Sequence, residues 1–299
     1  MFKNILIIGC GMIGSSILRG VINQQICKKV YVFEKNIKYR KKIKKISKKI
    51  ILIKKLDKKI ENIDLVVIST PMNEYQKIIN KLNKNLKNNS LITDVGSTKG
   101  NVAKLIKEKL SKNLNWIMSH PISGSEASGP DFGSKNLFKN KWCILIKSKK
   151  KKFLEKKISK FWKKLGSKVI FMKEQEHDKI FSVTSHLPHL IAYNLIKTAQ
   201  DFQKTNKKNI IKYSAGGLRD FSRIAASNEI MWRDVFFNNK KNLSVIIDLF
   251  IKNLKNFKLD INKKRNSLLI NKLKKSKKVR QQILLLKQDI SKPDFGRKN

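Results

Sequence analysis

The sequence is short of acidic residues, cysteine and long apolar runs, and each shortage excludes a class of protein. Its 299 residues hold 21 Asp and Glu against 68 Lys and Arg, which gives a formal net charge of +47. The three cysteines lie far apart without a CxxC pair, which argues against a disulfide framework and favours a reducing compartment. No run approaches the ~18 apolar residues of a membrane span, and the apolar N-terminal segment is too short for a signal peptide's core. We expect a soluble, cytoplasmic protein that has no membrane partner.

The positive charge is spread along the chain instead of being gathered in one segment. Sixty of the basic residues are lysines, and they are scattered among isoleucine and asparagine from end to end. Segments 38–50 and 147–165 are typical of amphipathic helices with solvated lysine faces, not of a basic arm interleaved with stacking aromatics. Because no DNA-docking motif accompanies them, we expect no nucleic-acid partner. A basic nucleic-acid-binding protein that retains a nucleotide fold is the non-enzyme alternative.

The first half alternates short apolar runs with helical segments. Helices are expected after the first strand, over 73–87, from about 98, and over 150–165. The expected strands are 4–8, 30–33, 64–69, 91–94, 116–119, 142–146 and 168–171. This alternation predicts an α/β fold, a doubly wound, mostly parallel sheet of the Rossmann type. In such sheets ligands bind beyond the carboxyl ends of the strands.

The first strand runs directly into a GxGxxG motif, and a helix follows. Gly9 permits the tight turn, Gly11 lets a pyrophosphate approach the backbone, and Gly14 lets the helix pack close to the strand. Glu34 ends the second strand, where its carboxylate can accept hydrogen bonds from both ribose hydroxyls of NAD and would repel the 2′-phosphate of NADP. An ordinary exposed strand-end residue is the alternative for Glu34. We predict NAD as the cofactor, bound by Gly9, Gly11, Met12, Ile13, Gly14, Glu34, Thr70 and Pro71.

His120 is the first histidine whose position suggests a role. It follows a predicted strand, at the same edge as the glycine motif, Thr70 and Ser97. The segment after it, 121–129, is rich in small residues and can lie close to a ligand. We expect His120 to act on that ligand; a buried histidine whose ring is satisfied by backbone is the alternative.

Beyond about residue 173 the strand signals disappear and helical periodicity takes over. The longest apolar stripe, which is typical of a core or a subunit interface, is formed by Leu243, Ile246, Phe250, Leu254, Phe257 and Ile261. We expect a dinucleotide-binding domain over 1–173 and an all-helical domain over 174–299, with a frayed tail from about 286.

The other three histidines, His177, His186 and His189, cluster in the first part of the helical half. Pro188 is expected near a helix start, which would place His189 in the first turn, four residues after Ser185. An HxxH pair with one more ligand can bind a metal, but no HExxH motif or companion carboxylate closes such a site here. We therefore expect no metal.

Arginine is rare in this lysine-rich chain, and three of its eight arginines lie within fifteen residues. The planar guanidinium can grip a carboxylate with two hydrogen bonds, which lysine cannot do. Arg219 and Arg233 adjoin Asp220 and Asp234, so structural ion pairs explain them. Arg223 has no adjacent carboxylate in the sequence and is the better candidate for binding a ligand.

Taken together, these motifs resemble the prephenate/arogenate dehydrogenase family of tyrosine biosynthesis. The matching segments cover most of residues 4 to 235, in family order: GCGMIGSSI, VVISTPMNEY, ITDVGSTKG, SHPISGSEASGP, EHDKIFSVTSHLPHLIAY and GGLRDFSRIAASNEIMWRDV. The resemblance implies a nucleotide-binding domain followed by a helical dimerisation domain, and hence a homodimer. It also implies an NAD(P)-dependent oxidative decarboxylation that yields 4-hydroxyphenylpyruvate or tyrosine.

The resemblance also assigns roles to single residues. His120 matches the family's catalytic histidine, which hydrogen-bonds the ring hydroxyl, and Ser97 matches the serine that orients both that hydroxyl and His120. Arg223 matches the arginine that holds a substrate carboxylate. Ser185 and His189 match a polar pair that lines the pocket, with His186 nearby.

The choice between two substrates depends on Asn228. In the family, an acidic residue five positions after the carboxylate-binding arginine is associated with arogenate, whose side chain carries an ammonium group. Asn228 stands there in this chain and offers no charge to pair with ammonium, so we expect prephenate to be preferred. Glu229, one residue on, keeps arogenate use or dual specificity open.

The chain departs from the family pattern in two respects. No mutase-like segment precedes the fold and no regulatory domain follows it, so we expect neither a fused chorismate mutase nor built-in tyrosine feedback.

β-Hydroxyacid dehydrogenases, the nearest enzymatic alternative, carry a helical KxxxN pair. The candidate helix here reads His189 to Asn194, with no lysine four residues before the asparagine.

Overall fold

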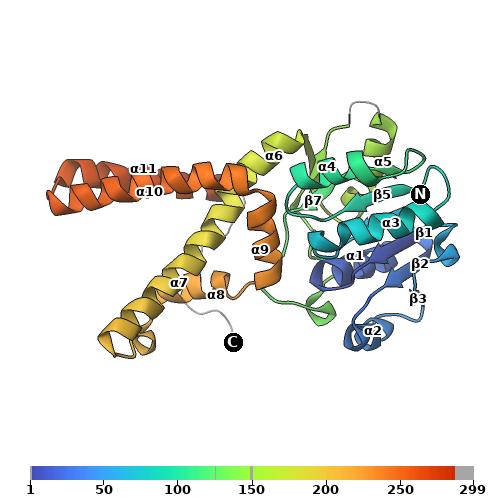
Figure 1. Cartoon of the computed structure of the whole chain (residues 1–299), viewed down its shortest axis with the longest axis horizontal. Helices are drawn as coiled ribbons and strands as arrows, with labels where there is room; N and C mark the ends of the chain where they lie inside the picture. The colour runs from blue at the N-terminus through green and yellow to red at the C-terminus, as the bar shows by residue number, and fades with distance from the viewer. Residues whose placement is uncertain (1, 125, 149–150, 287–299) are drawn as a thin grey trace.

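The first half of the chain forms nine strands in a computed structural model that describes residues 2–124, 126–148 and 151–286. Six strands form a parallel sheet of order β3-β2-β1-β4-β5-β6 (Figure 1). Their bounds are Phe2–Ile8 (β1), Cys27–Phe33 (β2), Ile50–Ile53 (β3), Leu65–Ile68 (β4), Leu91–Asp94 (β5) and Asn115–Trp116 (β6). The other three form a small sheet of order β7-β8-β9, with bounds Ser119–Pro121, Trp142–Ile146 and Lys168–Met172.

Apolar side chains on both faces of the large sheet explain why its strands read as unbroken apolar runs. In β1, Ile5 and Ile7 point into one buried cluster, whereas Leu6 and Ile8 point into another on the opposite face. Helices cover both faces, as the expected doubly wound fold requires. The helices of this half are Met12–Asn23 (α1), Ile37–Lys44 (α2), Tyr75–Asn85 (α3), Gly100–Lys109 (α4) and Lys152–Lys164 (α5).

The sheet differs from the sequence expectation in two places. The single strand expected over 116–119 is two strands in two sheets, because the chain leaves the large sheet after Trp116 and pairs with β8 from Ser119 onward. His120 therefore lies within β7, opposite Ile144 of the antiparallel strand β8, and does not follow a strand. Strand β3 was not predicted, since its short IILI run lies between lysines.

The second half contains only helices among the described residues. Its α-helices are Glu174–Phe181 (α6), Leu187–Asn206 (α7), Gly216–Ala225 (α8), Glu229–Asn238 (α9), Lys240–Asn262 (α10) and Asn266–Leu285 (α11). The all-helical expectation is confirmed. Helices α10 and α11 lie side by side and extend away from the sheets (Figure 1). The frayed tail expected from about 286 falls almost wholly on 287–299, outside the described residues.

A π-helical turn joins α6 to α7. Ser182–His186 are π-helical, so the chain is continuously helical from Glu174 to Asn206, and Pro188 does not follow a break in the helix as expected. Proline has no N–H to continue an α-helical ladder, and the wider turn just before it accommodates that missing donor. The turn also holds Ser185 and His186, two of the predicted site residues.

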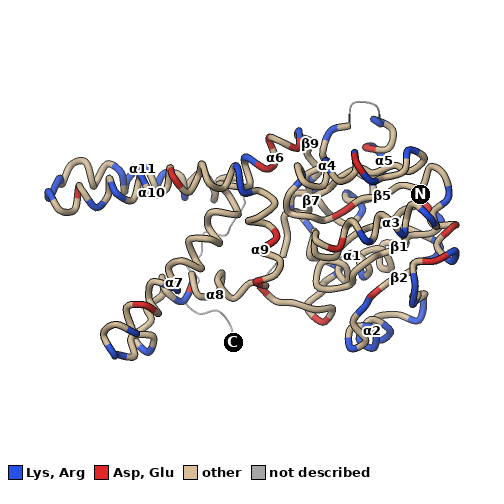
Figure 2. The backbone as a smooth tube through the Cα atoms, in the orientation of Figure 1, with Lys and Arg blue, Asp and Glu red and all other residues tan. Residues whose placement is uncertain are grey.

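Basic residues are distributed over both halves of the molecule. Figure 2 shows Lys and Arg along the helices of the α/β half and along α10 and α11 alike, with acidic residues between them. Within the described part of the chain, no helix combines the length and the apolar character that a bilayer span would need.

The close approach of α1 to β1 predicts the effect of one substitution. A Cβ atom on Gly14 would lie 2.2 Å from the backbone oxygen of Gly9 and 2.6 Å from Oγ of Ser69. Alanine normally favours a helix over glycine by about 1 kcal/mol, but a clash with backbone outweighs that gain. We expect Gly14→Ala to lose about 1–3 kcal/mol of unfolding free energy in urea titrations.

Gly11→Ala is the matched control, because a Cβ atom on Gly11 would meet nothing within 4 Å. Gly11 is the residue that precedes α1, where alanine replaces glycine at a loss below about 1 kcal/mol. Equal stability of the two variants would show that α1 can move away from β1 without loss.

Candidate active site

The glycine motif, Thr70 and Ser97 follow three neighbouring strands, β1, β4 and β5, at their carboxyl ends. Gly9 has φ 81°, a left-handed conformation that favours glycine. Thr70 lies directly against it, since a Cβ atom on Gly9 would be 2.7 Å from Cγ2 of Thr70. The Thr70 hydroxyl is buried and makes no hydrogen bond within the described residues. The edge of the sheet thus presents an unpaired hydroxyl beside the glycine turn; Pro71, the next residue, is exposed.

Glu34 is held by the backbone of this same edge. Its Oε2 accepts a hydrogen bond from the N–H of Cys10 at 2.7 Å, and its Oε1 accepts one from the N–H of Asn36 at 2.8 Å. The residue is 9% exposed, so it is not the ordinary exposed strand-end residue of the alternative. Each oxygen keeps a further lone pair for a ligand hydroxyl.

The start of α1 also suits a dinucleotide. Gly11 precedes the helix and has no side chain to cap it, and Met12, Ile13 and Gly14 form its first turn. Amides at a helix N-terminus favour a phosphate group. The open space at Gly11, the Glu34 carboxylate and the Thr70 hydroxyl together match what a bound NAD would need.

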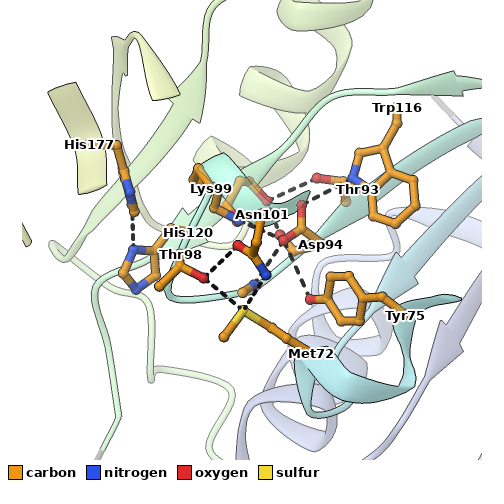
Figure 3. Close-up of polar contacts among 12 residues, drawn as sticks. Met72, Tyr75, Thr93, Asp94, Thr98, Lys99, Asn101, Trp116, His120 and His177 are labelled. Carbon is orange, nitrogen blue, oxygen red and sulfur yellow. Dashed lines mark hydrogen bonds and ion pairs between the residues drawn. The ribbon is translucent and has the colours of Figure 1, made fainter. Parts of the chain in front are cut away.

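His120 is joined to the helical half by a chain of short contacts. Its Nδ1 lies 2.8 Å from Nε2 of His177 (Figure 3), and Nδ1 of His177 lies 2.8 Å from Oδ1 of Asp178. The His120 and His177 rings also contact Phe181, one turn further along α6. The alternative of a buried His120 satisfied by backbone is wrong, because the ring's Nδ1 pairs with another imidazole.

Asp178 anchors this chain to the α/β half. Its Oδ1 accepts a hydrogen bond from the N–H of Lys99, and its Oδ2 accepts one from the N–H of Gly100, both at 2.8 Å. These are amides at the start of α4, whose preceding residue offers no capping side chain. A carboxylate from α6 therefore caps α4 and favours its positive N-terminal end.

Burial keeps the imidazoles neutral. It is the main cause that puts the pKa of His120 well below its usual range, with the nearby His177, Lys99 and His186 adding to it. Burial also lowers the pKa of His177 and His186, the latter to about 4. Burial alone would raise the pKa of Asp178, but hydrogen bonds from His177, Gly100 and Lys99 lower it. Near neutral pH the site holds neutral rings and an ionised Asp178.

His186 is oriented by Asn239, the residue that precedes α10. The Nδ2 of Asn239 donates to the backbone oxygen of Asp178 at 2.7 Å and lies 3.0 Å from Nδ1 of His186. Its Oδ1 accepts from Asn242, so the amide orientation is determined. His186 must accept at Nδ1 and carry its proton on Nε2. This Nε2 is buried, lies close to the backbone of Ser97 and has no hydrogen-bond partner of good geometry within the described residues. The structure thus brings His186 and Ser97 together.

His189 has the opposite arrangement. Its Nδ1 lies 2.9 Å from the backbone oxygen of Ser185 and must donate to it, which leaves Nε2 as an acceptor. The ring stacks on Trp232 of α9, with centroids 3.6 Å apart, and the His186 ring meets the same indole edge-on. Trp232 therefore links the two histidines.

Arg223 has a carboxylate partner that the sequence did not reveal. Its Nη1 lies 3.4 Å from Oε2 of Glu126, a residue 97 positions earlier in the loop after β7. Gly124 in the same loop approaches Met12, since a Cβ atom there would lie 3.5 Å from the methionine methyl group. Ser125, between them, is outside the described residues. Arg223, which has no adjacent carboxylate in the sequence, thus pairs with one from a distant loop, and the same loop approaches Met12 of the glycine motif.

Asn228 lies exposed at the start of α9. Its Oδ1 accepts a hydrogen bond from the N–H of Met231 at 2.9 Å, so the side chain caps the helix. Arg233 pairs with Asp234 at 2.6 Å, which confirms the structural ion pair expected from their adjacency.

A buried ion pair lies close to His120 (Figure 3). Nζ of Lys99 donates to Oδ2 of Asp94 and to the backbone oxygen of Ser119, both at 2.6 Å, and both side chains of the ion pair are fully buried. Trp116 adds a hydrogen bond to Oδ1 of Asp94. Sequence reasoning missed this pair; the one signal was a lysine in a glycine- and serine-rich turn. Among the described residues, no three His, Cys, Asp or Glu side chains are arranged to hold a metal ion.

Comparisons with known proteins extend over both halves of the chain. A family model described as the nucleotide-binding domain of prephenate dehydrogenase matches residues 22–171, and one described as the prephenate dehydrogenase dimerization domain matches 173–275. A cyclohexadienyl dehydrogenase from Zymomonas mobilis is 32% identical over 292 residues, 97% of this chain and 98% of that protein. A prephenate dehydrogenase from Lactococcus lactis is 31% identical over 93% of this chain and 77% of its own length.

A solved structure gives the same result in three dimensions. The prephenate dehydrogenase from Aquifex aeolicus, in complex with hydroxyphenyl propionate and NAD+, matches with a TM-score of 0.88 and 32% identity. The match covers 95% of this chain and 99% of that one. The similarity therefore includes the α/β half, the helical half and their relative arrangement.

The buried ion pair generates a stability prediction. Lys99→Met would leave Asp94 charged, buried and without its cation, at a loss of about 3–5 kcal/mol of unfolding free energy. Asp94→Asn would in turn leave the Lys99 ammonium unpaired. We expect the double variant to lose clearly less than the sum of the two single losses, measured by denaturant unfolding. Additive losses would mean that the two charges do not depend on each other.

Proposed function

Because the chain belongs to the prephenate dehydrogenase family, we propose that it catalyses the NAD-dependent oxidative decarboxylation of prephenate to 4-hydroxyphenylpyruvate. The observation that carries this proposal is the neutral, buried imidazole of His120, oriented by the helical half of a chain that matches the family over both halves. Family membership favours this reaction over that of a β-hydroxyacid dehydrogenase.

The cofactor belongs at the carboxyl edge of the large sheet. When bound there, NAD+ supplies the acceptor for the hydride that leaves the ring carbon of the substrate. The α1 amides after Gly11 would hold the pyrophosphate, and Thr70 would lie beside it. Glu34 would accept hydrogen bonds from the ribose hydroxyls and would disfavour the extra phosphate of NADP.

His120 would act on the ring hydroxyl. As the ring carbon loses its hydride, its oxygen becomes acidic, and the neutral imidazole accepts a hydrogen bond and then the proton. The bond to the ring carboxylate breaks at the same stage, and its electron pair enters the ring as CO2 leaves. Formation of the aromatic ring makes the reaction strongly favourable, so the protein has mainly to position the acceptors. Ser97 would orient the hydroxyl from the turn after β5.

Arg223 would hold a carboxylate of the substrate. Its side chain is 42% exposed, and the guanidinium pairs with Glu126 at a distance of 3.4 Å, which is longer than in a strong bidentate pair. A substrate carboxylate can therefore replace Glu126 without leaving a buried charge unpaired. Ser185, His186 and His189 would line the pocket from the helical half, with one donor at His186 and one acceptor at His189.

The two halves would have different roles. Residues 1–173 would bind the cofactor, whereas residues 174–299 would complete the substrate pocket and form a homodimer. The second family model describes a dimerization domain. Large apolar side chains are exposed along α10 and α11, among them Leu254 (57%), Ile261 (59%) and Leu273 (56%). Apolar surface of this extent favours burial against a second copy.

We propose no nucleic-acid partner. Lysines are distributed over both halves (Figure 2), whereas a nucleic-acid interface gathers them on one face.

The proposal is tested by measuring reduction of the nicotinamide cofactor with prephenate and with arogenate, each offered once with NAD and once with NADP. We expect turnover with prephenate, a higher kcat/KM for prephenate than for arogenate, and a higher kcat/KM with NAD than with NADP. If neither acid led to reduction of NAD or NADP, the proposed reaction would be refuted. A higher kcat/KM with NADP than with NAD would refute the role of Glu34.

Asn228→Asp tests the choice of acid without disturbing the fold. Aspartate caps a helix as well as asparagine does, so the variant adds a charge and keeps the hydrogen bond to Met231. We expect the ratio of kcat/KM values to move toward arogenate by about tenfold, or roughly 1.4 kcal/mol. An unchanged ratio would show that residue 228 serves only as the cap of α9.

A further inference from the structure

His177 and Asp178 form a chain behind His120 that the proposed reaction does not itself explain. Both are buried, with exposures of 0% and 5%, and the two contacts that link them to His120 are each 2.8 Å long. They come from α6, whereas His120 comes from β7. The contacts determine where every proton in the chain must sit.

The Asp178 carboxylate sets the direction of the chain. The N–H of Lys99 and the N–H of Gly100 can only donate, and they donate to Oδ1 and Oδ2. The carboxylate is ionised and carries no proton, so the contact at 2.8 Å from His177 exists only if Nδ1 of His177 donates. The reverse tautomer would place a ring lone pair against a carboxylate oxygen.

The proton position on His120 is fixed in the same way by its contact with His177. A neutral His177 that carries its proton on Nδ1 has a bare Nε2, which can only accept. His120 lies 2.8 Å away and must therefore donate from its Nδ1. A neutral His120 with a proton on Nδ1 has its free lone pair on Nε2, the nitrogen on the other side of the ring from His177.

We propose that His177 and Asp178 are positioning residues that lock His120 in the tautomer whose Nε2 accepts the proton of the substrate hydroxyl. The assignment rests on the proposed function for the identity of that hydroxyl, whereas the tautomer itself follows from the contacts. Free imidazole side chains favour a proton on Nε2. Without His177 and Asp178, His120 would therefore present a donor where an acceptor is required.

His177 and Asp178 also stabilise the positively charged form of His120 that follows proton transfer. When the substrate O–H bond breaks, its proton forms a bond to Nε2 of His120, and the ring becomes an imidazolium. The positive charge then faces Asp178 through His177, and the Nδ1 proton can shift to Nε2 of His177. As the ring becomes aromatic the proton returns to the oxygen, so no proton is gained or lost overall. Lys99, whose ammonium lies nearby, opposes this charge, which makes the Asp178 carboxylate the more necessary.

Two substitutions at position 177 separate positioning from packing. In His177→Gln the amide oxygen can reach the place of Nε2 and accept from His120, but it takes no proton. In His177→Phe the ring and its packing on Phe181 stay while the acceptor is lost. We expect His177→Phe to lower kcat roughly 100-fold or more with little change in KM for NAD, and His177→Gln to lose at least tenfold less.

The tautomer of His120 can be observed directly, because the protein has four histidines and their labelled rings give few signals. In ¹⁵N-histidine NMR spectra of the ligand-free wild-type protein, we expect His120 to carry its proton on Nδ1 and to have a bare Nε2. His177→Gln should keep this pattern, and His177→Phe should shift the His120 proton to Nε2.

The outcomes are distinct. A His120 proton on Nε2 in the wild-type protein would overturn the proposal whatever the activity. Equal losses of kcat in both variants with an unchanged His120 tautomer would also overturn it, because His177 would then only fill space. If the wild-type protein shows the expected tautomer but does not oxidise prephenate, the proposed function fails while the proton arrangement stands.

Discussion

The arrangement of the site depends on one carboxylate, that of Asp178. It receives two amides from the start of α4 in the α/β half and one ring N–H from its neighbour His177, while its own helix α6 belongs to the helical half. These three donors satisfy a buried charge, and a buried charge without them would be strongly destabilising. The carboxylate therefore ties together the two halves, the N-terminus of α4 and the orientation of His120.

Other features of the site follow from this connection. Lys99 contributes its backbone N–H to Asp178 and its ammonium to Asp94, so the turn before α4 is held from both sides. Asn239 donates to the backbone oxygen of Asp178 and orients His186, which brings the start of α10 into the same network. The π-helical turn then presents Ser185 and His186, and His189 stacks on Trp232. These groups are held by defined contacts, which suits a reaction that depends on position more than on activation.

The sequence predicts the parts of this structure that depend on local pattern. Strands buried on both faces read as apolar runs, and the glycine motif stands in its expected context between β1 and α1. What it could not predict are contacts between distant segments. Glu126 and Arg223 are 97 residues apart, and His120 and His177 are 57 apart. Nothing in the spacing of a loop glutamate or a helical histidine indicates which partner the fold will bring to it.

The lysine-rich composition makes the exceptions informative. Most lysines of the chain are solvent-exposed, whereas the Lys99 side chain is fully buried and its ammonium is held by Asp94 and by the backbone oxygen of Ser119. The histidines differ in the same way, because each of the four has a partner at Nδ1. Those partners, not the ring type alone, decide whether a ring offers a donor or an acceptor to a ligand.

The most direct test of this account is a crystal structure with NAD+ and 4-hydroxyphenylpyruvate bound. The account predicts that His120 keeps Nδ1 on His177 while its Nε2 meets the phenol oxygen, and that a ligand carboxylate replaces Glu126 on Arg223. A phenol oxygen that meets Nδ1 of a turned His120 ring, or a ligand bound away from His120, would contradict it.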